Sequence, residues 1–198
     1  MIDRVPPRRN RNLSPLGRTL LAMRAARPLP LLIVATLAVT LGGCSGSPSP
    51  RAWAASVCTA LSPWRTEIGT LTTSTQQQMT AATTPPQAKE NLMALFQGAQ
   101  EASEKARSGV AEAGVPDVDN GRQIADGFIS SLSAMRDAYG RARSGIEALA
   151  TSPTKTFYTQ VAAVVDTLNT EYSKSDLDTS KIDSKELSQA FAEVPECR

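Results

Sequence analysis

The sequence predicts an all-α protein, an up-down four-helix bundle with a short C-terminal helix, closed by a disulfide bond. Residues 51–198 contain four long stretches in which apolar side chains recur every three or four positions, as on one face of a helix. Prolines and glycines gather at intervals between these stretches, where helices begin and end. Two cysteines lie near the two ends of this region.

The first helix is expected to begin after Ser49, whose hydroxyl can cap it, with Pro50 at the first helical position. Pro63 lies inside this helix and has no amide N–H, so we expect it to kink or split the helix. The polar stretch 72–84 that follows is expected to be only weakly helical. The apolar stripe comprises Trp53, Val57, Leu61, Trp64, Ile68 and Leu71.

The second helix is expected to begin near Thr84 and two prolines, and to end at Gly114, with Pro116 beyond it. The third is expected from about Asp119 to Thr151. The second stripe comprises Leu92, Phe96, Ala99, Ala102, Ala106 and Val110. The inward residues of the third comprise Ile124, Phe128, Leu132, Met135, Ala142, Ile146 and Leu149.

Ser152 and Pro153 are expected to start the fourth helix, and a polar linker, 173–181, leads to a short final one. Asp183, with Glu186 three residues later, resembles a capping box for that final helix. The fourth stripe comprises Phe157, Val161, Val164, Leu168 and Tyr172, and the final helix carries Leu187 and Phe191. Short connections between antiparallel helices predict the bundle.

The N-terminal segment has the pattern of a secretory signal. Seven arginines and one acid precede an uncharged apolar run, 29–41, and small residues follow it. As a helix this run would span about 20 Å, less than the ~30 Å of a hydrocarbon core, so a membrane-spanning helix is the less favoured alternative. Residues 1–43 are therefore predicted to be a signal peptide, and Met23 would itself start a compact one.

The apolar run ends in Leu41, Gly42, Gly43 and Cys44, which resembles the lipobox of bacterial lipoproteins. This resemblance implies that the Cys44 thiol takes a diacylglyceryl group, that cleavage precedes Cys44, and that the lipid anchors the chain on the extracytoplasmic face of the cell membrane. Two or more acyl chains hold a protein stably to a bilayer. Residues 44–50 would then be a flexible tether. The alternative is a free or disulfide-bonded Cys44.

Removal of residues 1–43 changes the sign of the net charge. The remaining 155 residues carry 14 Lys and Arg against 18 Asp and Glu, a net charge of −4. An acidic domain argues against a nucleic-acid partner and against simple attraction to anionic lipid. If Cys44 carries lipid, Cys58 and Cys197 remain, and in an exported protein we expect them to form a disulfide; two free thiols are the alternative.

This layout is similar to that of small helical lipoproteins of high-GC Gram-positive bacteria, many of which lack a known function. The resemblance depends on the lipobox, on Cys58 preceding Pro63 and Trp64, on the stretch 116–121, and on the closing Cys197 and Arg198. It implies the fold and the location, and it supplies no catalytic residue.

Several classes of site have no support in the sequence. The chain contains no histidine, which excludes Ser–His and Cys–His nucleophile pairs and the commonest metal ligand. There is no Cys-x-x-Cys zinc spacing, P-loop or dinucleotide fingerprint. Asp117, Asp119 and Asn120 partly resemble a calcium loop, but the rest of that pattern is missing. The favoured interpretation is a loop whose acids cap the positive end of the third helix. We therefore predict no metal, no cofactor and no catalysis.

Arg136, Tyr139 and Arg143 follow helical spacing and form a candidate anion patch. The alternative is a solvated face on which the arginines pair with Asp137 and Glu147. Trp53 and Trp64 occupy stripe positions, which favours core packing over a ligand pocket.

The leading functional hypothesis is a lipid-anchored binding or scaffolding module of the cell envelope, with an envelope protein as its partner. The second is a carrier or sensor of a small apolar ligand held between helices, which would leave an unfilled cavity. The third, an enzyme that uses only carboxylates, would need two acids that converge in a cleft.

Overall fold

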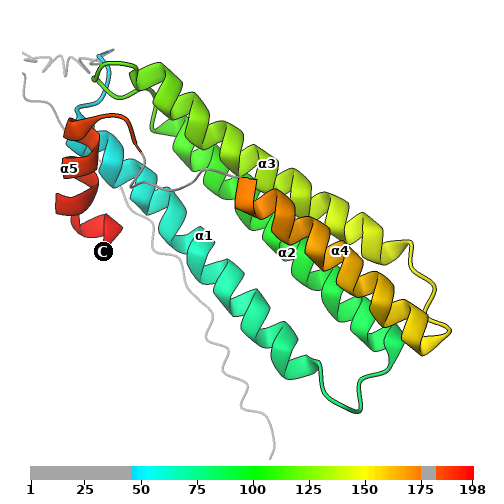
Figure 1. Cartoon of the computed structure of the whole chain (residues 1–198). Coiled ribbons are helices and arrows are strands. Elements are labelled where there is room, and N and C mark those ends of the chain that lie inside the picture. The colour runs from blue at the N-terminus through cyan, green and yellow to red at the C-terminus, as the bar shows by residue number, and fades with distance from the viewer. Residues whose placement is uncertain (1–45, 175–181) are drawn as a thin grey trace, which may run out of the picture. The chain divides into compact units, whose positions relative to one another are not determined.

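The computed structural model describes residues 46–174 and 182–198, and over these ranges the predicted all-α fold is confirmed (Figure 1). The signal peptide and the lipobox residues Leu41, Gly42, Gly43 and Cys44 lie outside the described residues. The helices are α1 (Pro50–Gln78), α2 (Pro85–Glu112), α3 (Gly121–Glu147), α4 (Thr154–Lys174) and α5 (Lys185–Glu193), followed by the 3₁₀ helix η2 (Pro195–Cys197).

α1 begins as predicted and ends later than predicted. The Ala52 amide donates to the Ser49 hydroxyl at 3.3 Å, and Pro50 occupies the first turn. The helix continues through Pro63, so the expected split does not occur, and it includes the polar residues 72–78. Packing outweighs weak propensity in these last turns, because Leu71 packs against α2 and Thr75 is buried.

The boundaries of the other helices differ from prediction by a few residues. α3 is shorter than the predicted 119–151 at both ends. Asn120, with φ of 58°, directs the chain into α3, so the helix begins at Gly121. The cap of α5 is Ser184 rather than Asp183, because the Ser184 hydroxyl accepts the Leu187 amide at 3.3 Å. The cap therefore lies one residue later than predicted, and the predicted capping box is wrong, because the residue three positions after Ser184 is Leu187.

The helices pack in a definite order. α2 packs along both α1 and α3, α4 packs mainly on α3, and α5 and η2 pack on α1. No Cα atom of α1 lies within 8 Å of a Cα atom of α4 (Figure 1). Two shorter helices therefore occupy the fourth side of the bundle. α5 covers the end of the bundle where α1 begins, and α4 covers part of the opposite end.

Two apolar clusters follow from this arrangement. The first joins α1, α2, α3 and α5 around Trp53, which makes edge contacts with Phe128 at 5.5 Å and Phe191 at 5.9 Å between ring centroids. The second joins α2 and α3 around Phe96 and Ile146, with half-buried residues of α4 packed against it. No described helix is long and apolar enough to cross a membrane.

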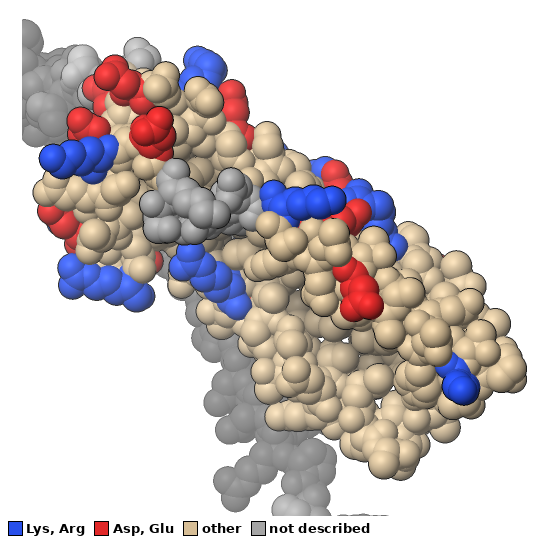
Figure 2. Space-filling view, viewed as in Figure 1, with Lys and Arg blue, Asp and Glu red and all other residues tan. Residues whose placement is uncertain are grey.

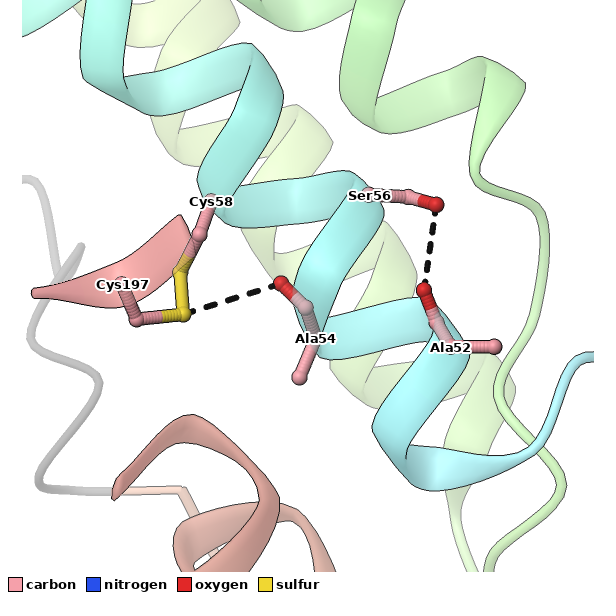
Figure 3. The surroundings of a disulfide bond; sticks show 5 residues. All are labelled: Ala52, Ala54, Ser56, Cys58 and Cys197. Atoms are coloured by element: carbon pink, nitrogen blue, oxygen red, sulfur yellow. Dashed lines mark hydrogen bonds between the residues drawn. A yellow bond between two sulfur atoms is a disulfide. The ribbon is translucent and has the colours of Figure 1, made fainter. Parts of the chain in front are cut away.

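The predicted disulfide between Cys58 and Cys197 is confirmed (Figure 3). It joins residues 139 positions apart and connects η2 to the third turn of α1. The Cys197 Sγ also lies 3.8 Å from the Ala54 carbonyl oxygen. The C-terminus is thereby held against the beginning of the helical region.

Candidate functional site

A groove of about 580 Å³ lies on the surface between α1 and α2. Its floor is made by small side chains and by two glycines, at positions where the helices approach closely. The floor residues are Ala60, Gly98, Ala102, Ala106 and Gly109.

Close approach of the two helix backbones explains why the groove exists. A Cβ atom on Gly109 would lie 2.8 Å from the Cβ of Ala60, and one on Gly98 would lie 2.9 Å from Cδ1 of Leu71. Both distances are too short for ordinary carbon atoms, so glycine permits this approach. The same small residues leave the outer surface of the helix pair uncovered, which produces the groove.

Trp64 forms one apolar wall of the groove while remaining 7% exposed. Its indole Nε1–H donates to the Ser103 hydroxyl at 3.1 Å, and Ser103 donates in turn to the Ala99 carbonyl at 2.8 Å. The polar atom of the indole is thus satisfied inside the protein, and Trp64 offers the groove carbon surface. Trp53 and Trp64 are both buried, in keeping with the prediction that they pack in the core.

Pro63 and Thr59 lie one helical turn apart on α1, beside Trp64. Because proline has no amide N–H, Pro63 cannot donate the usual helical hydrogen bond to the Thr59 carbonyl. Both residues line the groove. The Thr59 carbonyl therefore lacks its standard intrahelical donor.

Charged side chains surround the apolar floor. Glu67 of α1 and Glu101 and Glu112 of α2 are exposed at its rim, against the single cation Lys105. Glu101 accepts a hydrogen bond from Gln97 at 3.0 Å, whereas Glu67 and Glu112 form no ion pair within the described ranges. The rim has a net charge of −2 and mostly presents acceptors.

The three residues of the candidate anion patch have different environments. The Arg136 guanidinium pairs with Glu104 at 2.8 Å and with Asp137 at 2.7 Å, the partner that the alternative interpretation named. Tyr139 is 8% exposed in the second apolar cluster, and burial raises the pKa of its hydroxyl to about 12. Arg143 has a buried Nε without a hydrogen-bond partner. Arg136 and Tyr139 are thus engaged elsewhere, and the anion patch stays a prediction.

Arg107 of α2 and Arg136 of α3 both bind Glu104 of α2, and the Arg136 ion pair joins the two helices. Hydrogen bonds first from Arg107 and then from Arg136 lower the pKa of the Glu104 carboxyl from 4.5 to about 2. A carboxyl group whose pKa is lower in the folded state stabilises the fold at pH values above its unfolded-state pKa. This stabilisation is lost as the pH falls through the folded-state pKa.

The Glu104 ion pairs are therefore expected to stabilise the protein at pH 7 and to lose this effect between about pH 5 and pH 2. Glu104 is 42% exposed, so Glu104→Gln should cost less than about 1 kcal/mol at neutral pH. Urea denaturation of both proteins across this range measures the difference. Glu90→Gln, an exposed position on α2, is the control, and a Glu104 effect that persists undiminished at pH 2 would contradict the assignment.

No group of three or more Cys, Asp or Glu side chains that could hold a metal ion occurs among the described residues. Asp117 and Asp119 are exposed in the loop before α3, and Asn120 makes no side-chain cap to that helix. The three rim acids were not among the residues that the sequence singled out as a candidate site. Glu101, Lys105 and Glu112 lie at helical spacing beside the apolar stripe of α2, and this pattern was the signal that could have found them.

The described residues thus define an all-α, disulfide-closed domain with an open groove between its first two helices. Comparisons with protein-family models, with curated proteins and with solved structures find no match.

Proposed function

We propose that the protein is a lipid-anchored lipoprotein on the extracytoplasmic face of the cell membrane, and that it binds an envelope protein through the α1–α2 groove. The observation that carries the proposal is the groove itself, which combines an apolar floor with acidic side chains on an exposed surface. Such a surface suits recognition. The chain also lacks histidine, and Cys58 and Cys197 are bonded to each other, so the proposal involves no catalysis.

The anchor rests on the lipobox resemblance, and its test is independent of the groove. Cys44→Ala removes the thiol that would take the lipid, so the variant is expected to move from the membrane fraction to the soluble fraction of native cells. Cell fractionation and immunoblotting measure this change. Ser47→Ala, in the expected tether, is the control and should remain with the membrane. Undiminished membrane association of the Cys44 variant would contradict lipidation.

Photo-crosslinking in intact native cells tests the binding role. A photoreactive amino acid in place of Lys105 lies at the groove rim, and the same amino acid in place of the exposed Arg122 on α3 is the matched control. We expect a discrete protein adduct from position 105, absent from position 122 and dependent on Cys44. Identical adducts from both positions, or none from position 105, would contradict the proposed function.

A second candidate function, carriage of a small apolar ligand, is favoured by the separation of α1 from α4. Ile68 and Leu71 of α1 and Val161 and Val165 of α4 are only partly buried against the second apolar cluster. Figure 2 shows that the surface over the distal parts of these helices is largely uncharged and hollowed. A tryptophan in place of Val161 would fill space there and should displace any copurifying apolar molecule, which native mass spectrometry detects.

A further inference from the structure

We propose that the occupant of the α1–α2 groove is a basic amphipathic α-helix of the partner protein. This inference rests on the proposed function and specifies the chemistry of the partner. The apolar face of such a helix would lie on the small-residue floor, and its Lys or Arg side chains would reach the rim acids.

The shape of the groove fits a helix. Its α2 wall extends from Gly98 to Glu112, about 21 Å or four helical turns. Its walls are two antiparallel helices, and its floor is built from alanine and glycine, so a third helix can approach closely and present residues at helical spacing. Trp64 supplies a flat apolar surface against which a Leu or Met side chain can pack.

The positions of the acids define where the occupant carries charge. Since Ala60 faces Gly109 and Leu71 faces Gly98, antiparallel register places Glu67 near Glu101 at one end of the groove. Glu112 lies eleven residues from Glu101, about 16 Å along the helix axis and on the same face. No single small cation can contact both ends, whereas a helix with basic residues at i and i+11 can.

The remaining polar groups agree with this assignment. Lys105 lies between the two acidic ends, so an acidic or neutral residue midway along the occupant would face it. Thr59 and Pro63 also line the groove, and the Thr59 carbonyl lacks the amide donor that Pro63 cannot supply. An acidic helix would instead place like charges together at both ends of the groove.

Two synthetic peptides and the full-length chain test the inference. The first peptide is an amphipathic helix with a Leu/Ala face and Lys at i and i+11, and the second carries Glu at those two positions. Fluorescence anisotropy of the labelled peptides measures the Kd. We expect the Lys peptide to bind, the Glu peptide to bind at least about tenfold more weakly, and the Lys peptide's affinity to fall as ionic strength rises.

Variants of the protein locate the binding site. The exposed acids Glu67, Glu101 and Glu112, changed together to Gln, should weaken binding of the Lys peptide about tenfold. A triple change to Gln at the equally exposed Glu90, Glu147 and Glu196, outside the groove, is the matched control and should leave the Kd unchanged. All of these substitutions are isosteric surface changes, so circular dichroism and Tm should match the wild type.

Equal binding of the two peptides, no binding of either, or an equal loss in the two triple variants would overturn the inference. If position 105 still captures a protein in cells while neither peptide binds, the proposed function stands and the basic helix is wrong. If position 105 captures no protein, the proposed function itself fails.

Discussion

Changing Cys58 and Cys197 together to alanine is expected to lower the free energy of unfolding by about 5 kcal/mol. The two residues are 139 positions apart, and in the chain-entropy model a cross-link that closes so long a loop removes a large part of the freedom of the unfolded chain. Alanine is chosen because Cys58 is 4% exposed, so a serine hydroxyl would be buried there. Urea denaturation monitored by circular dichroism measures the loss.

The structural consequence should concentrate at one end of the domain. α5 has nine residues, and apart from the disulfide it is held against α1 chiefly by Leu187, Phe191 and Val194 in the first apolar cluster. Reduction of the wild-type protein is the control and should reproduce the stability of the double variant. A stability loss below about 1 kcal/mol in both would show that the bond contributes little to the folded state.

Trp53→Ala is expected to lower the free energy of unfolding by about 3–5 kcal/mol, the second large effect. Trp53 is 0% exposed and packs edge-on against both Phe128 and Phe191, so its removal leaves a cavity where α1, α3 and α5 meet. Its indole Nε1–H also donates to the Gly114 carbonyl at 2.8 Å, which connects α1 to the loop after α2. Urea denaturation midpoints provide the measurement.

Two further variants separate packing from hydrogen bonding. Trp53→Phe keeps an aromatic ring but leaves the Gly114 carbonyl without its donor, and should cost about 1–3 kcal/mol. Tyr158→Ala removes a ring that is 37% exposed on α4 and should cost roughly 0.5 kcal/mol. If Trp53→Ala costs no more than Tyr158→Ala, the aromatic cluster is not the centre of the core.

The periodicity of apolar residues predicted every α-helix and most of the buried face of α1, α2 and α3. On α4 the prediction was partly wrong, because only Phe157 is buried and Tyr172 is 43% exposed. Trp53, Leu132 and Phe157, for example, lie at predicted inward positions and are completely buried. The predicted disulfide is also present, and it depended on counting cysteines rather than on any geometry. The lipobox, the anchor and the binding role remain predictions.

Helix ends were harder to predict from the sequence. Residues 72–78 have a composition with low helix propensity, yet they form the last turns of α1. Pro63 does not divide the helix either. The propensities of ordinary polar residues differ by a fraction of a kcal/mol each, and a proline inside a helix costs about 3 kcal/mol. Contacts with neighbouring helices can outweigh both. The cap of α5 was misplaced because Asp183 and Ser184 are both good capping residues and only the backbone geometry selects Ser184.

The sequence by itself determined the helical class, the buried stripes of α1, α2, α3 and α5 and the cysteine pair, because each depends on local spacing or on residue counts. Only the tertiary structure decided which stripe packs against which. It left α1 and α4 apart and divided the fourth side of the bundle between α4 and α5. It also formed the α1–α2 groove, since the close approach of Gly98 and Gly109 to α1 depends on how two distant segments meet.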